Sequence, residues 1–81
     1  MKFQSLKSYL EDNGCSIDHC EGISYFVSNV INGEICILEE KSDYSDINLI
    51  HLFRTLKVSP PKYLRDNYYA FIKQQKAFNK H

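Results

Sequence analysis

The sequence predicts an α+β fold in the element order α-β-β-β-α-α, with a three-stranded antiparallel meander and helices packed on one face. Three observations support this prediction. Apolar residues recur at helical spacing near both ends of the chain, and residues 15–40 are rich in β-branched and aromatic side chains. Asn-Gly pairs, which favour helix ends and tight hairpin turns, occur twice. At 81 residues the chain has the length of a single domain, residues 1–81.

The N-terminal segment predicts a helix over residues 3–13, because it carries an apolar stripe at helical spacing. The stripe consists of Phe3, Leu6 and Leu10. Asn13-Gly14 then supplies the left-handed conformation that commonly ends a helix. Residues 15–20 are too few and too mixed in character for a helix, so we expect an edge strand there.

A β-hairpin is predicted next, with strands over residues 23–31 and 34–40. Asn32-Gly33 between them fits the positive φ angles of a two-residue type I′ turn, which would place Ile31 opposite Glu34. Both faces of this hairpin are partly apolar, and we favour for the core the face that is more apolar near the turn. That face holds Phe26, Ser28, Val30, Ile35 and Ile37, and the other holds Val27, Asn29, Ile31, Cys36 and Leu38.

Two helices are predicted in the C-terminal half, over about residues 46–57 and 60–77. The candidate N-caps of the first are Ser42, Asp43 and Ser45. Ser59 followed by Pro60 is a typical start for the second. The apolar stripes are Leu49, Leu52, Phe53 and Leu56 in the first helix, and Leu64, Tyr68, Phe71 and Ile72, followed by Gln75, in the second. We expect the compact part to span residues 3–66 and residues 67–81 to form a helical C-terminal extension.

The composition favours a folded protein away from membranes. Leu, Ile, Val and Phe make up 23 of the 81 residues, more than in disordered chains. No stretch approaches the ~18 consecutive apolar residues of a membrane span, and the N-terminus lacks the apolar core of a signal peptide. Three cysteines, an odd number, fit a reducing compartment, so we expect a cytoplasmic location.

The three cysteines also raise the question of a metal site. Cys15, Cys20 and Cys36 could be joined with His19 around a zinc ion, but the spacing lacks the two paired clips that such sites use. We expect instead that these cysteines are small apolar residues on strands, and that no metal is bound.

The net charge of zero hides a division along the chain. Residues 1–52 hold three basic and nine acidic residues, whereas residues 53–81 hold seven basic residues and one acidic residue. Such polarity suits pairing between the two halves of the chain, or an acidic partner for the basic half. The alternative is two solvated faces that differ in sign.

The sequence offers little support for catalysis. The patterns GxSxG, P-loop, Rossmann glycine motif and HExxH are all missing, and three glycines leave no phosphate cradle, so no nucleotide or other cofactor is expected. His19 and His51 are the candidate acid–base groups, with His81 at the end of the chain. Asp18 and His19 are strand neighbours that point to opposite faces, so they are not expected to form a dyad.

Binding of RNA is conceivable because the chain holds six Tyr and five Phe, which can stack on bases. The strands, however, carry glutamates that repel phosphate: Glu21, Glu34, Glu39 and Glu40. RNA would therefore bind through the basic C-terminal helix, and the residues involved would be Lys57, Lys62, Arg65, Lys73 and Lys76.

The segment LKSYLEDNGCSI combines a predicted helix, a glycine stop and a strand, and INLIHLFRTLKVSPPKYL combines a later helix with the turn that follows. In these segments and their order, the chain resembles the HicA family of bacterial toxins. EGISYFV stands where the family has a KGSHH-type segment. The resemblance covers residues 5–66 and implies a fold like the double-stranded-RNA-binding domain, together with ribonuclease ancestry.

The sequence departs from the HicA pattern where the chemistry lies. Ser24 stands at the position of the family's catalytic histidine, and Glu21 replaces its lysine. A serine is not a general acid or base near neutral pH without an activating partner. The resemblance therefore implies a member whose nuclease chemistry is lost, unless His19 substitutes.

Together, these observations favour a small non-catalytic interaction module that binds a protein partner or self-associates. The residues expected to form its surface are Lys62, Tyr63, Arg65, Tyr68, Tyr69 and Lys73. The alternative is a HicA-like toxin ribonuclease acting on RNA, with His19 or His51 as the acid–base group.

Overall fold

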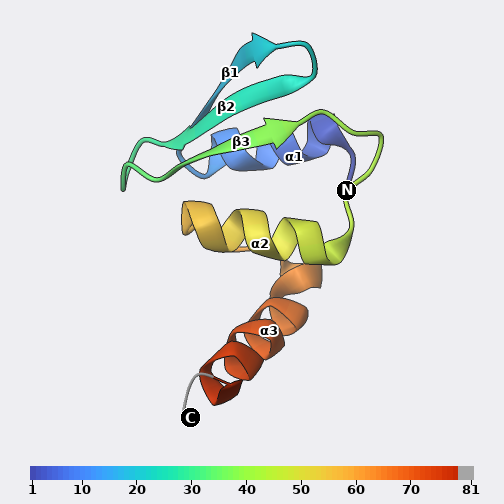
Figure 1. Ribbon diagram of the computed structural model, residues 1–81, viewed down its shortest axis with the longest axis vertical. Helices are drawn as coiled ribbons and strands as arrows, with labels where there is room; N and C mark the ends of the chain where they lie inside the picture. Colours follow the sequence, from blue (N-terminus) through green and yellow to red (C-terminus); the bar gives the residue numbers. More distant parts are fainter. Residues whose placement is uncertain (79–81) are drawn as a thin grey trace.

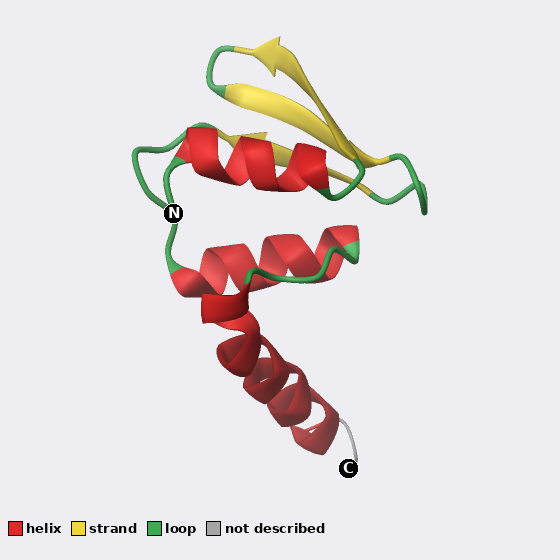
Figure 2. Cartoon of the chain, turned by 180° about the vertical axis from the view of Figure 1, so that it is seen from behind, coloured by secondary structure: helices red, strands yellow, loops and turns green. Residues whose placement is uncertain are grey.

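A three-stranded sheet with two helices on one of its faces forms the body of the protein (Figure 1, Figure 2). The computed structural model describes the backbone of residues 1–78 and the side chains of residues 1–74. It confirms the α+β element order α-β-β-β-α-α. The elements are α1 (Phe3–Asp12), β1 (Cys15–Glu21), β2 (Ser24–Asn29), β3 (Ile35–Glu39), α2 (Asp46–Leu56), the short 3₁₀ helix η1 (Lys62–Leu64) and α3 (Arg65–Phe78).

The sheet is an antiparallel meander in the order β1-β2-β3, so β1 and β3 are both edge strands. α1 and α2 lie on the same side of it, and α3 lies beyond α2, on the side away from the sheet (Figure 1). None of the helices in the described part of the chain is long and apolar enough to cross a membrane.

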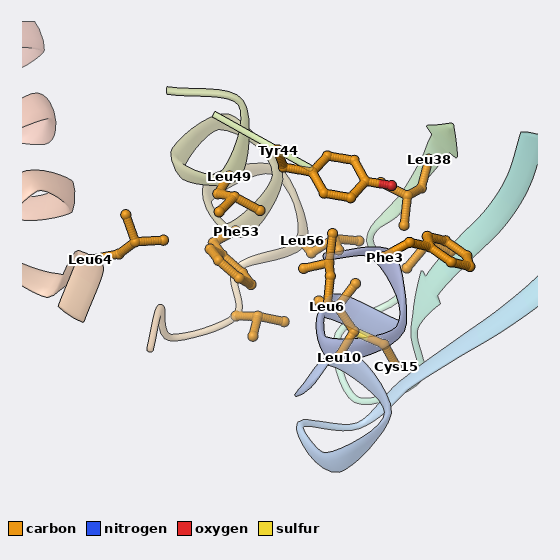
Figure 3. Close-up of a cluster of buried hydrophobic side chains, with 12 residues drawn as sticks. Phe3, Leu6, Leu10, Cys15, Leu38, Tyr44, Leu49, Phe53, Leu56 and Leu64 are labelled. Carbon is orange, nitrogen blue, oxygen red and sulfur yellow. The ribbon is translucent and has the colours of Figure 1, made fainter. Parts of the chain in front are cut away.

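The core fills the space between the sheet and the two helices (Figure 3). The predicted stripes of both helices contribute to it, and Leu64 of η1 reaches the same cluster. The completely buried large side chains are Leu6, Leu10, Val27, Leu49, Phe53, Leu56 and Leu64. The C-terminal segment is therefore fastened to the core before α3 begins.

The predicted choice of sheet face is wrong. Val27 is fully buried and Leu38 is 6% exposed, whereas Ile35 and Ile37 on the opposite face are 55% and 59% exposed. The buried face includes Asn29, and both polar atoms of its side chain are hydrogen-bonded: Nδ2 donates to the Leu56 carbonyl at 2.9 Å, and Oδ1 accepts from the Ile31 amide at 3.0 Å. A polar side chain whose groups are hydrogen-bonded is tolerated in a core, so counting the apolar residues of each face selects the wrong face.

The predicted type I′ turn is also wrong. The Asn29 amide donates to the Glu34 carbonyl at 2.8 Å, and the Gly33 amide donates to the Asn29 carbonyl at 2.8 Å, so the loop has four residues, 30–33. Gly33 has a φ of +79°, but Asn32 is not among the residues with positive φ. Instead, the Asn32 side chain accepts a hydrogen bond from the Glu34 amide at 2.9 Å, which favours the wider loop.

The wider loop shifts the strand register by two residues, so that Val27 rather than Asn29 lies opposite Cys36. Because side chains alternate with a period of two, this shift leaves every residue on its predicted face. The error in the turn is thus separate from the error in the choice of face.

The start of the last helix differs from the prediction. Ser45 is confirmed as the N-cap of α2, since its side chain accepts from the Asn48 amide at 3.2 Å. The next helical turn, however, begins only at Lys62, after Pro61 in an extended conformation with a ψ of 158°. A residue that precedes proline is disfavoured in the helical region, so Pro60 cannot begin a helix when Pro61 follows.

Candidate interaction surface

The residues predicted to bind a partner lie on η1 and α3, which the segment 58–64 holds against the core. Val58, Pro60 and Leu64 are buried in this segment. The Tyr9 hydroxyl of α1 donates a hydrogen bond to the Ser59 carbonyl at 2.6 Å. Burial raises the pKa of Tyr9, and the nearby positive charge of Arg65 opposes this rise. The first turn of α3 is therefore fixed relative to both helices of the body.

Further along, α3 touches α2 through Phe71. The ring of Phe71 lies 5.1 Å from that of His51 in an edge-to-face arrangement, and the Arg54 guanidinium lies 5.8 Å from the centre of the same Phe71 ring. Tyr68, Phe71 and Ile72 are half-buried, and the other described side chains of α3 are exposed. Most of the helix surface is thus open to solvent.

Four of the six predicted residues share one exposed side of η1 and α3. Lys62, Arg65, Tyr69 and Lys73 are all exposed and follow one another at three- and four-residue steps. Residues at these steps lie on one face of a helix. We call these four residues the basic stripe. Lys76 also belongs to α3, but its side chain lies outside the described residues, as do the side chain of Gln75 and the whole of His81.

The other two predicted residues are placed differently. Tyr68 is half-buried and packs edge-to-face on Tyr69, with 5.6 Å between the ring centres. Tyr63 is exposed but lies near the N-terminus of α2, where burial and the charges of Asp46 and Asp43 raise its pKa. Tyr68 therefore supports the basic stripe, whereas Tyr63 faces an acidic neighbourhood.

The two candidate catalytic histidines are not brought together. His19 lies on β1, where its Nε2 is 2.7 Å from the Gly22 carbonyl and its ring packs on Tyr25 at 5.2 Å. His51 lies on α2 against Phe71. Neither histidine is hydrogen-bonded to a carboxylate in the part of the chain that the structure describes. The geometry therefore offers no acid–base pair.

A groove of about 460 Å³ runs between the free edge of β3 and α2. Its walls include Cys36, Leu38, Tyr44, His51 and Leu52. The Tyr44 hydroxyl in this groove donates to the Glu39 carbonyl at 2.5 Å and accepts from the Lys41 amide at 3.2 Å. Both contacts are internal, and they hold the turn of the chain that precedes α2.

The three cysteines differ in their exposure and are not gathered with other ligand residues in the described part of the chain. Cys15 is buried, Cys36 is half-buried and Cys20 is exposed, and all three are free thiols. Over residues 1–74, whose side chains are described, no group of three or more His, Cys, Asp or Glu is arranged to hold a metal ion. Burial, together with the neighbouring Cys15, raises the pKa of the Cys36 thiol to about 11. Burial also raises the pKa of Cys15.

These differences predict the order in which the thiols react. With iodoacetamide at pH 8, Cys20 is expected to be labelled first, because the thiolate is the reactive form and Cys36 stays protonated until the pH nears 11. Intact-protein and peptide mass spectrometry would follow the labelling, with the urea-unfolded chain as the control in which all three react. Equal rates for Cys20 and Cys36 in the folded protein would contradict this assignment.

The sequence prediction missed one feature, the uncovered face of the sheet. Cross-strand pairing places Asp18, Phe26 and Ile37 in one row and Glu21, Ser24 and Glu39 in the next. We call this surface, together with Ile35, the open sheet face. The alternation of apolar residues along β2 and β3 indicates this face, but the prediction places its apolar residues in the core.

In the described part of the chain, most charged residues of the acidic and basic halves form no ion pair with one another. Among the described residues, one ion pair joins the acidic and basic halves, between Lys57 Nζ and Glu34 Oε1 at 3.2 Å. No cation of the basic stripe forms an ion pair in this part of the chain.

Comparison with protein-family models, curated protein sequences and solved structures finds no match to this chain.

Proposed function

We propose that this protein is a small non-catalytic interaction module that binds a protein partner through the basic stripe on η1 and α3. The observation that carries the proposal is the state of the stripe, which is exposed, free of ion pairs in the described part of the chain, and held to the core by Leu64 and Tyr9. A surface fixed in this way loses little conformational freedom when a partner binds.

The chemistry of the stripe suits a protein better than RNA. Arg65 and Tyr69 are of the residue types that are enriched in interfaces and that dominate their binding energy. Asp66 lies on the same exposed helix, and Asp43 and Asp46 lie near Tyr63. These carboxylates would repel a phosphate backbone. An acidic protein surface can place separate carboxylates at Lys62, Arg65 and Lys73 and away from Asp66, whereas the phosphates of RNA follow one another at short, regular spacing.

The double variant Arg65→Glu with Lys73→Glu tests this proposal. We expect it to weaken binding of the partner more than tenfold, since two favourable charge contacts become repulsive. Lys2→Glu with Lys41→Glu is the matched control, because it makes the same charge change at exposed positions outside α3. Circular dichroism would show that both variants are folded.

The measurement has two steps. Pull-down from the protein's own cell extract identifies a candidate captured by the wild type and the control variant. Calorimetry then gives the Kd of that purified partner for each variant. Equal affinity of the wild type and the α3 variant would show that the stripe is not the binding surface.

Incubation with structured and single-stranded RNA, at low and physiological salt, separates the HicA-like alternatives. We expect neither cleavage nor a gel shift at physiological salt. Cleavage that is lost in His19→Ala or His51→Ala would instead establish a ribonuclease. A salt-sensitive shift without cleavage would establish an RNA-binding protein that uses the basic helix.

A further inference from the structure

The open sheet face exposes apolar side chains that a single chain leaves uncovered. Phe26 is 36% exposed, and Ile35 and Ile37 beside it are more than half exposed. α1 and α2 occupy the opposite face of the sheet, and α3 lies on the far side of α2 (Figure 1, Figure 2). An apolar sheet face rimmed by polar residues is typical of an interaction site.

The charge of this face indicates what covers it. Asp18, Glu21 and Glu39 flank the apolar residues, and none of the residues that the strand pairing places on this face is basic. A segment that presents cations on both sides of an apolar or aromatic side chain would complement such a surface. The basic stripe has this composition, with Tyr69 between Arg65 and Lys73.

Within one molecule the two surfaces lie at opposite ends, so they cannot meet (Figure 1). We propose that a second copy of this chain covers the open sheet face by laying its α3 helix across the strands. The proposal rests on the proposed function, and it names the partner of the same helix surface.

The dimensions of the two surfaces agree. Arg65 and Lys73 are eight residues apart, which corresponds to about 12 Å along a helix. The edge strands β1 and β3 are two strand spacings apart, which is about 10 Å. A helix that crosses the strands therefore brings one cation near Glu21 and the other near Glu39. Tyr69 then lies over β2, where Phe26 provides an aromatic contact.

The contact is head-to-tail, because the basic stripe and the open sheet face lie at opposite ends of each copy (Figure 1). The α3 of the covered copy stays free for the sheet of a further copy, so the arrangement is heterologous and can extend beyond two copies. The chain has no net charge, so two copies do not repel one another as a whole. The contact is nevertheless electrostatic in part, and we expect it to weaken as salt rises.

Sedimentation equilibrium of the full chain at low and high salt tests this inference. We expect self-association at low salt, with a Kd at least tenfold higher at high salt. Arg65→Glu with Lys73→Glu should be monomeric, and so should Glu21→Lys with Glu39→Lys. Glu11→Lys with Asp12→Lys is the matched control on exposed positions of α1 and should self-associate like the wild type.

Mixing the two monomeric variants provides the sharpest readout. In the mixture the acidic α3 of one variant faces the basic sheet of the other, and the remaining pair of surfaces is native, so both contacts are restored. We expect the equimolar mixture to associate. A wild type that is monomeric at low salt, self-association that survives in either variant alone, or a mixture that stays monomeric would overturn the inference.

These outcomes are distinct from failure of the proposed function. A monomeric wild type that still binds a different protein through Arg65 and Lys73 overturns only the pairing of two copies. If Arg65→Glu with Lys73→Glu changes neither self-association nor partner binding, both proposals are wrong.

Discussion

Phe53→Ala is expected to lower the free energy of unfolding by about 3–5 kcal/mol. The Phe53 side chain is completely buried and meets the Tyr9 ring edge-to-face at 5.5 Å. It belongs to the cluster that joins α1, α2 and Leu64, so its removal leaves a cavity that three elements would have to fill (Figure 3). A small domain has a total stability of only about 5–15 kcal/mol, so this loss removes a large share of it.

Urea unfolding followed by circular dichroism measures this effect. Ile47→Ala on the same helix is the control, because Ile47 is 53% exposed and its loss should cost less than about 1 kcal/mol. A Phe53→Ala protein as stable as the Ile47→Ala protein would show that Phe53 is not central to the core.

Asn29→Asp is expected to destabilise the protein by about 3–5 kcal/mol at neutral pH. The substitution keeps the shape of the side chain and the acceptor for the Ile31 amide, but it replaces the donor to Leu56 with a carboxylate oxygen. Asn29 is 4% exposed, so the new charge would be buried opposite a carbonyl. No cation is hydrogen-bonded to Asn29 in the described part of the chain.

The loss of stability caused by Asn29→Asp should depend on pH, and the pKa of the new acid determines its direction. Burial opposite a carbonyl raises the pKa of the new acid in the folded state above its unfolded value of about 3.9. The folded state then binds more protons than the unfolded state, so stability falls as pH rises and recovers toward pH ~4. Asn32→Asp is the control: Asn32 is exposed and its amide is 3.2 Å from the same Leu56 carbonyl, so a smaller and less pH-dependent loss is expected. Equal losses for the two variants across this pH range would contradict the assigned role.

The element order was predictable because it depends on local patterns. The stripe of Phe3, Leu6 and Leu10 and the N-cap at Ser45 act within one or two helical turns, and both are confirmed. The covered face of the sheet was not predictable, because it depends on whether Asn29 finds a partner 27 residues away at Leu56. The prediction of the hairpin turn is wrong for a related reason, since the side-chain amides of Asn29 and Asn32 both donate hydrogen bonds to that carbonyl.

The candidate surface was predictable in part. Helical spacing places Lys62, Arg65, Tyr69 and Lys73 on one side, and the structure leaves all four exposed. It separates Tyr63 from them and half-buries Tyr68, because both positions depend on how α3 meets α2. The open sheet face could not be recognised as a surface while its apolar residues were assigned to the core.

The side-chain amides of Asn29 and Asn32, which donate to the Leu56 carbonyl at the end of α2, affect how the protein unfolds. They tie the β2–β3 loop to the Leu56 carbonyl, just where the chain leaves α2 for Ser59 and η1, and Tyr9 holds that same segment from α1. Because this junction contacts the sheet, α1 and α2, we expect these elements to unfold as one cooperative unit. Beyond Leu64, α3 touches the body only along one side. Its amide protons should therefore exchange with solvent sooner than those of the body, while its first turn stays fixed by Leu64 and by the hydrogen bond from Tyr9 to Ser59.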